Sequence, residues 1–221
     1  KDAKEYGSIL NIHSIDFALL YARFDAIIDD VSLFRQGALD ELLPLVNVAF
    51  AMAQKYDAVI TNPPYMGVGN LSALVNEYVK KNYADSKTDL FSVFIERCNQ
   101  MLKNNGYQAM ITMHAWMFLN SFEKLRNKMC HWNIINMAHL GARGFEEISG
   151  EVVQTTSFVV RKHMIGNYVG CYCRLVDPSS QQAKEEAFLR GEGRFFATQN
   201  KQIINPLHHP FNMTRHRQAR L

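Results

Sequence analysis

Hydrophobic and polar residues repeat with two different periods along this chain, and the two patterns alternate. Apolar residues recur at helical spacing in four segments, which are residues 32–55, 71–82, 89–103 and 121–130. Short runs rich in β-branched and apolar residues predict strands between them, at residues 56–61, 107–113 and 134–138. This alternation of strand and helix predicts an α/β fold with a mainly parallel sheet and helices on its faces.

The next part of the chain predicts the antiparallel end of that sheet. Two β-rich runs, residues 152–162 and 168–176, are separated by Gly166 and Asn167, which favour a hairpin turn. A helix is then expected over residues 179–190, and hydrophobic periodicity is lost from about Ile203. We therefore divide the chain into a domain of residues 1–176 and an extension of residues 177–221, consisting of a helix and an irregular basic tail.

Four local signals refine these elements. Residues 8–12 predict a short strand. Pro44 lies inside the helix predicted over residues 32–55 and is expected to kink or split it. The sequence Asn104-Asn105-Gly106 is expected to end the helix of residues 89–103, and Ser121 to cap the next one.

Composition excludes some classes of protein but does not indicate a function. A formal net charge of +3 is compatible with binding to a polyanion, but it is too small to indicate such a partner. The four cysteines lack a repeated spacing, which fits a reduced cytoplasmic protein better than a disulfide framework or zinc ribbon. Cys171 and Cys173 would share one strand face, where packing is favoured over metal binding, so no metal is expected. No apolar run is long enough to cross a bilayer, and the absence of an initiator Met suggests a start inside a larger protein.

The tetrapeptide Asn62-Pro63-Pro64-Tyr65 directly follows the strand predicted at residues 56–61, which we expect to be buried. A purely structural interpretation is a rigid turn in which the prolines fix φ and the tyrosine packs. That interpretation explains the rigidity but not the position, because open α/β sheets bind ligands at the carboxyl ends of their strands. The position therefore favours a catalytic role.

The tetrapeptide has the groups needed to bind and activate an exocyclic amine on an aromatic base. Such a nitrogen is a poor nucleophile, because its lone pair is delocalised into the ring. The Asn62 side-chain oxygen and the Pro63 carbonyl can each accept one N–H bond, which would localise the lone pair, while Pro64 holds that carbonyl still. Tyr65 would stack on the base, which must first be flipped out of its duplex.

These residues resemble adenine-N6 methyltransferases that use S-adenosylmethionine. The likeness includes Met66-Gly67 and residues 81–97, it covers approximately residues 1–195, and it is strongest to the methyltransferases of BREX phage-resistance systems and fused type II restriction-modification enzymes. The resemblance implies a partial Rossmann-like methyltransferase core, S-adenosylmethionine as cofactor and double-stranded DNA as partner. It also implies that Asp89 opens a helix flanking the cofactor pocket, and that Phe145 stacks on the flipped base opposite Tyr65. Packing of Phe145 into the core is the alternative.

Two features of the family are absent from this sequence. No glycine-rich cofactor loop precedes Asn62. The acidic residue for the ribose hydroxyls, expected after the strand that follows such a loop, is also absent. The residues that bind the cofactor are therefore unknown, and we expect upstream and downstream segments of the same enzyme to be partners. The tail after Asn200 departs from the family, and it is either unstructured or a DNA-binding arm.

Three functional hypotheses remain open from the sequence. The first is site-specific methylation of adenine-N6 in DNA, in restriction-modification or phage defence. The second is methylation of a protein glutamine amide, which also presents a planar NH2 group to the same tetrapeptide. The third is a truncated chain that keeps the base pocket, lacks the cofactor and acts at most as a DNA-binding module.

Overall fold

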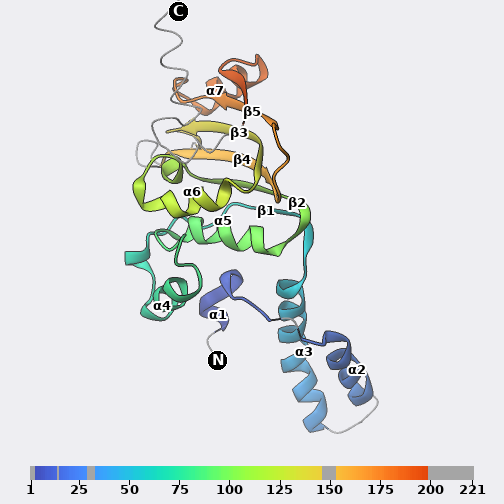
Figure 1. Cartoon of the computed structure of the whole chain (residues 1–221). Helices are drawn as coiled ribbons and strands as arrows, with labels where there is room; N and C mark the ends of the chain where they lie inside the picture. The colour runs from blue at the N-terminus through green and yellow to red at the C-terminus, as the bar shows by residue number, and fades with distance from the viewer. Residues whose placement is uncertain (1–2, 14, 29–32, 146–152, 199–221) are drawn as a thin grey trace, which may run out of the picture. The chain divides into compact units, whose positions relative to one another are not determined.

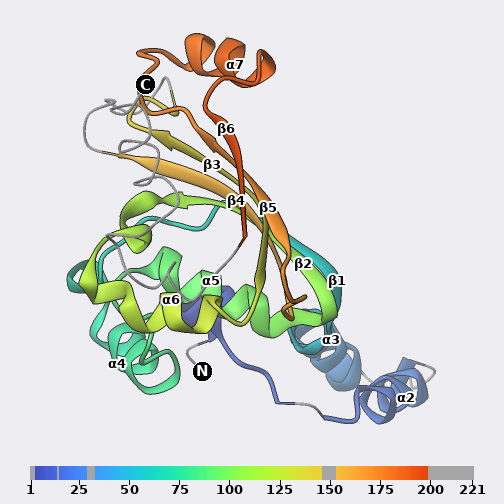
Figure 2. The same cartoon turned by 45° about the horizontal axis from the view of Figure 1, so that its top comes forward.

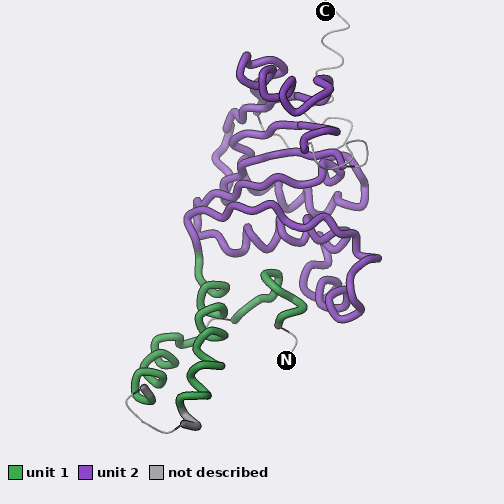
Figure 3. The backbone as a smooth tube through the Cα atoms, turned by 180° about the vertical axis from the view of Figure 1, so that it is seen from behind, with its two compact units in different colours: residues 1–55 green, residues 56–221 purple. Residues whose placement is uncertain are grey.

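The computed structural model describes residues 3–13, 15–28, 33–145 and 153–198. The chain divides into two compact units, residues 1–55 and 56–221 (Figure 3). The first unit is helical and consists of α1 (Ala3–Tyr6), the 3-10 turn η1 (Gly7–Ile9), α2 (Phe17–Ile28) and α3 (Leu33–Ala53). The strand predicted over residues 8–12 is wrong, because that segment begins with the 3-10 turn and contains no strand.

Helices α2 and α3 pack against each other through aromatic rings. The ring of Phe50 lies 5.2 Å from that of Phe17 and 5.8 Å from that of Tyr21, both edge-on. The Tyr21 hydroxyl also donates to Asn47 Oδ1 at 2.8 Å. Pro44 does not split α3, which runs from Leu33 to Ala53 as a single helix with the proline inside it.

The second unit is built on a six-stranded sheet with the order β1-β2-β4-β3-β5-β6. Its strands are β1 (Tyr56–Thr61), β2 (Leu102–Met113), β3 (Asn133–Gly141), β4 (Thr155–Arg161), β5 (Val169–Arg174) and β6 (Arg194–Thr198). The pairings β1 with β2 and β3 with β5 are parallel, whereas β4 and β6 are antiparallel to their neighbours. Four strands therefore run in one direction, and the predicted α/β class is confirmed.

Two helices cover one face of this sheet. The second unit contains the helices α4 (Ala73–Asn82), α5 (Leu90–Met101), α6 (Glu123–Met129) and α7 (Gln181–Leu189), and the 3-10 turns η2 (Val68–Asn70), η3 (His114–Met117) and η4 (Asn120–Phe122). Helices α5 and α6 lie side by side against the sheet (Figures 1 and 2). The main core lies between them and the strands, and it includes Phe91, Ile95, Leu125, Met129, Met110, Ile134, Phe158 and Tyr172.

The hairpin predicted from β4 and β5 is wrong. Strand β4 pairs with β2 on one side and with β3 on the other, so it lies inside the sheet, while β5 pairs with β3 and β6. Asn167 does adopt a positive φ of 58°, as a turn at Gly166 and Asn167 would require. The local signal identified the turn correctly, but both edges of β4 are already occupied by other strands.

Strand β1 is an edge strand and not the buried strand that we predicted. Among the described residues it pairs with β2 alone, and its side chains are at most partly buried. Ile60 is 79% exposed although it is apolar and lies within the strand. The apolar run at residues 56–61 correctly predicted a strand but not its position in the sheet.

Two helix ends also differ from prediction. Helix α5 ends at Met101 and β2 starts at once, so Asn104-Asn105-Gly106 lies inside the strand. Asn105 has a φ of 65°, and a Cβ on Gly106 would lie 3.0 Å from the Asp57 carbonyl oxygen, so this tripeptide forms an irregularity where β1 and β2 change register. Ser121 lies in the 3-10 turn before α6 and does not cap that helix.

The C-terminal part of the described chain extends the sheet beyond the predicted boundary at residue 176. Helix α7 begins as expected, with Ser180 Oγ accepting the Ala183 N–H at 3.1 Å. The chain then turns at Gly191 and Gly193, both with positive φ, and forms β6 against β5. The tail of residues 199–221, including the predicted basic arm, lies outside the described residues. A search of the described part of the chain finds no helix long and apolar enough to span a membrane.

Candidate active site

The predicted tetrapeptide leaves the carboxyl end of β1. Strands β2 and β3 run in the same direction as β1, so their carboxyl ends meet this same edge of the sheet. Asn62 and Pro64 are exposed, Pro63 is buried and Tyr65 is half-buried. The exposed amide of Asn62 is therefore open to a ligand at the edge where such sheets bind their ligands.

The Tyr65 hydroxyl lies within hydrogen-bond distance of two acceptors. It is 3.0 Å from Asn62 Oδ1 and 3.3 Å from the carbonyl oxygen of Ile111 on β2. A hydroxyl has one proton, so it donates to one of them at a time. Donation to Asn62 fixes the amide through one lone pair of its oxygen, which leaves the second lone pair for the amine of a base.

The Tyr65 ring is supported by the core. Its centroid lies 6.3 Å from that of Phe91, with the rings nearly perpendicular. Burial raises the pKa of the Tyr65 hydroxyl above its usual value, which keeps the group protonated and able to donate. The tyrosine therefore connects Asn62 to the first turn of α5 and to β2, while the predicted stacking of its ring on a base stays a prediction.

The loop that follows the tetrapeptide is tied to the start of α5. The N–H groups of Met66 and Phe91 both donate to Asp89 Oδ1, each at 3.1 Å. The backbone adds a bond from Leu90 N–H to Met66 O at 2.9 Å and one from Val68 N–H to Thr88 O at 3.2 Å. Burial raises the pKa of Asp89, against the opposing effect of the backbone N–H groups that it accepts.

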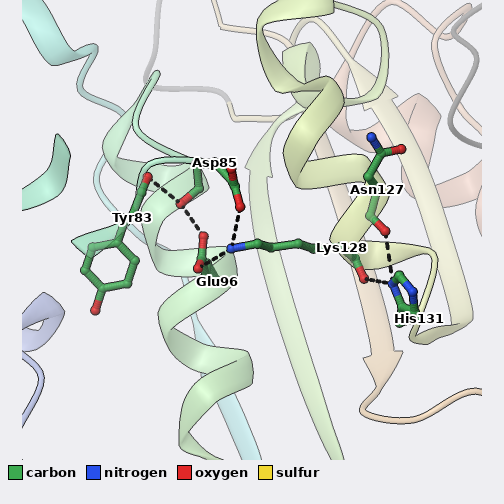
Figure 4. A network of polar contacts seen from close by, with 7 residues as sticks. Tyr83, Asp85, Glu96, Asn127, Lys128 and His131 are labelled. Atoms are coloured by element: carbon green, nitrogen blue, oxygen red, sulfur yellow. Dashed lines mark hydrogen bonds and ion pairs between the residues drawn. The ribbon is translucent and has the colours of Figure 1, made fainter. Parts of the chain in front are cut away.

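The turn that carries Asp89 is itself anchored by a charged network (Figure 4). Ser86 Oγ donates to Glu96 Oε2 at 2.8 Å, and Lys128 Nζ lies 2.6 Å from Glu96 Oε1 and 2.9 Å from Asp85 Oδ2. Burial opposes the charge of Lys128, but its bonds to Glu96 and Asp85 outweigh this and raise its pKa. The lysine ties the turn before α5 to α6.

Other polar groups lie near the same edge of the sheet. His114, directly after β2, and His139, near the end of β3, are joined by a 2.8 Å contact between Nδ1 and Nε2. Burial lowers the pKa of His114, which favours the neutral imidazole at this residue. Phe145 lies on the loop after β3 and is half-buried. Its stacking on a base stays a prediction.

The cysteines take no part in this site. Cys173 is buried with Leu175 and Ala187, and its thiol donates to the Glu192 carbonyl oxygen at 3.3 Å. The described cysteines are all reduced, and no group of three metal-ligating side chains is found among the described residues. Residues 146–152, and His208 and His209 of the tail, lie outside the part of the chain that the structure describes.

Sequence reasoning identified the tetrapeptide but not the groups that support it. Asp89 was expected only as an acidic first-turn residue and as part of a helix beside the cofactor pocket, and its bond to Met66 was missed. The Ile111 carbonyl was missed because backbone acceptors carry no sequence signal. The run Asp89-Leu90-Phe91 was the available clue, since an acid before an apolar helix start is a frequent N-cap.

Comparison with known proteins assigns the family. The Eco57I restriction-modification methylase model matches residues 16–145, which include Asn62 to Tyr65 as well as Phe145. The chain belongs to the Eco57I restriction-modification methylase family. The family resemblance read from the sequence is therefore confirmed.

Two curated relatives of this methylase family share long stretches with the chain. The adenine-specific methyltransferase PglX of Lacticaseibacillus casei (strain Zhang) is 54% identical over 149 residues, which are 67% of this chain and 12% of that protein. The adenine-specific methyltransferase BrxX of Escherichia coli O9:H4 (strain HS) is 40% identical over 192 residues, covering 85% of this chain and 16% of that protein. The chain thus spans less than a fifth of the length of either relative.

A solved structure of a DrdV–DNA complex is similar in fold. Its TM-score is 0.50 at 14% sequence identity, and the match covers 69% of this chain and 18% of that chain. At this identity the likeness shows the fold alone, and it agrees with the mixed α/β architecture described above.

Proposed function

We propose that a protein carrying this methylase chain transfers a methyl group to N6 of an adenine flipped out of double-stranded DNA. The observation that carries the proposal is the exposed Asn62 amide at the carboxyl end of β1, with its oxygen 3.0 Å from the Tyr65 hydroxyl. That oxygen and the Pro63 carbonyl accept the two N–H bonds of the amine and hold its nitrogen for attack. The names of the two curated relatives support adenine as the base.

S-adenosylmethionine is the methyl donor in this proposal, but the described residues ahead of β1 lack the loop that usually grips it. Such cofactors are gripped by a glycine-rich loop between a strand and a helix. The glycines ahead of β1 are Gly7, which starts a 3-10 turn, and Gly37, which lies inside α3. Neither glycine lies in such a loop.

The consequence for cofactor binding is measurable by calorimetry. Because the glycine-rich loop is absent, we expect the 221-residue chain alone to show no heat of tight binding when titrated with S-adenosylmethionine. S-adenosylhomocysteine titrated under the same conditions serves as the matched comparison. Tight binding of either compound by the chain alone would show that residues within it hold the cofactor.

The substrate class is tested by competition between two amine-bearing substrates. Labelled S-adenosylmethionine is offered with unmethylated double-stranded DNA and with a glutamine-containing peptide in the same reaction. We expect the label in DNA, in line with a role in restriction-modification or phage defence. Label in the peptide alone would overturn the proposal in favour of methylation of a protein glutamine amide.

Tyr65→Phe tests whether the hydroxyl orients Asn62. The phenylalanine keeps the aromatic ring but removes the donor that lies 3.0 Å from Asn62 Oδ1. A net hydrogen bond contributes about 1 kcal/mol, so we expect kcat to fall roughly fivefold to tenfold with little change in DNA affinity. Tyr65→Ala, which also removes the ring, should mainly raise KM through weaker capture of the base. Equal kcat in wild type and Tyr65→Phe would exclude the orienting role.

A further inference from the structure

Asp89 is separated from the tetrapeptide by the whole of α4, yet it contacts the residue that directly follows Tyr65. The Met66 N–H donates to Asp89 Oδ1 at 3.1 Å, and Gly67 forms an antiparallel bridge with Asp89. Met66 therefore cannot move away from the start of α5 without breaking the bond to Asp89, and any such movement would also displace Tyr65. The chain on the other side of Tyr65 is stiffened by Pro63 and Pro64.

The same carboxyl oxygen also organises α5. Asp89 is the N-cap of that helix, and Oδ1 accepts the Phe91 N–H at 3.1 Å. Ser92 Oγ completes the capping box by accepting the Asp89 N–H at 3.3 Å. One oxygen thus holds both the exit of the tetrapeptide and the first turn that carries Phe91, whose ring supports Tyr65.

The turn that precedes Asp89 is held in place by hydrogen bonds and ion pairs to α5 and α6. Ser92 Oγ donates to the Ser86 carbonyl oxygen, and Ser86 Oγ donates to the buried Glu96 side chain. Lys128 then bonds Glu96 and Asp85, as Figure 4 shows. Asp89 is therefore presented by a turn that is bonded to both α5 and α6, which suits it to hold a loop in place.

We propose that Asp89 is the positioning residue of the candidate active site, acting through the Met66 amide to hold Asn62 and Tyr65 in the geometry that receives the target amine. The inference rests on the proposed methyltransferase function for its kinetic consequence, but its structural consequence is independent of that function. Asparagine at this position keeps a side-chain oxygen for both N–H groups, and it is also a favoured N-cap residue. Alanine keeps neither.

The experiment compares Asp89→Ala, Asp89→Asn and Ser180→Ala by two measurements. The first is hydrogen exchange of the Met66 amide followed by NMR in the full 221-residue chain. We expect exchange to rise about fivefold to tenfold in Asp89→Ala, in line with the loss of one hydrogen bond, and to stay near the wild-type rate in Asp89→Asn. Ser180→Ala is the matched control, because it removes the N-cap oxygen that accepts the Ala183 N–H at the start of α7 and leaves Asp89 and its turn unchanged.

The second measurement is kcat for methyl transfer to DNA by a protein carrying the chain. A displacement of about 1 Å at a reacting group can cost roughly 100-fold, so we expect kcat to fall between about 10-fold and 100-fold in Asp89→Ala. Asp89→Asn should restore most of it, and Ser180→Ala should lower thermal stability while kcat stays near the wild-type value. Equal Met66 exchange in Asp89→Ala and wild type, or equal kcat in Asp89→Ala and Ser180→Ala, would overturn the proposal. If the wild type transfers no methyl to DNA while Met66 exchange still responds to Asp89→Ala, the proposed function fails and the positioning contact stands.

Discussion

Asn62→Ala is expected to abolish methyl transfer while leaving the fold intact. The Asn62 side chain is exposed, and its one described bond is to the Tyr65 hydroxyl, so its removal should change the free energy of unfolding by less than about 0.5 kcal/mol. Loss of one preorganised acceptor at a reacting group costs about 100-fold to 1,000-fold in kcat. Initial rates of labelled methyl incorporation into DNA, with thermal melting of both proteins, measure the two effects.

Asn62→Asp provides the matched control for that variant. Aspartate keeps an oxygen in the place of Oδ1, and the wider group of amino methyltransferases that the tetrapeptide resembles carries either residue. We expect Asn62→Asp to retain measurable activity well above that of Asn62→Ala. If Asn62→Ala kept more than about a tenth of the wild-type kcat, Asn62 Oδ1 would not be the acceptor that the chemistry requires.

Phe158→Ala should have the largest effect on stability. Phe158 lies on β4, is 1% exposed and contacts Trp116 edge-on with ring centroids 5.4 Å apart. Truncating a phenylalanine in such a core costs about 3 to 5 kcal/mol, because the cavity that remains collapses only in part. Urea unfolding followed by circular dichroism measures this loss.

Val159→Ala is the matched control for Phe158→Ala, because it truncates the neighbouring side chain of the same strand. Val159 is only partly buried on the opposite face of the same strand, so its truncation should cost less than about 2 kcal/mol. Losses of under about 1 kcal/mol for both variants would contradict the burial of Phe158 in the main core.

Local elements of this fold were predictable because their signals are local. The apolar stripe of α5 lies behind an acidic residue that turns out to be its N-cap, and Ser180 caps α7 in the same way. Strand pairing was not predictable in this way, because the alternation along β4 would look the same in a central strand or at an edge. β6 was missed because a short run, Arg194 to Thr198, follows two glycines and contains few β-branched residues.

In the candidate site, too, the contiguous residues were predictable from the sequence and the contacts between distant residues were not. The tetrapeptide is contiguous, so its chemistry could be read directly from the sequence. Its supports are not contiguous, since the acceptor for the Met66 N–H is 23 residues away and the Ile111 carbonyl is 46 residues from Tyr65. Such contacts depend on how α4 and α5 return the chain to the end of β1, and no pattern around Asn62 encodes that path.

In the proposed reaction, the group held by Asn62 is the N6 amine of adenine in DNA. The most direct measurement is digestion of DNA to nucleosides after reaction with S-adenosylmethionine, followed by mass spectrometry to locate the methyl group. We predict N6-methyldeoxyadenosine in the wild-type reaction and none above background with Asn62→Ala. Methylated cytosine without methylated adenine, or equal N6-methyldeoxyadenosine in both reactions, would contradict the account.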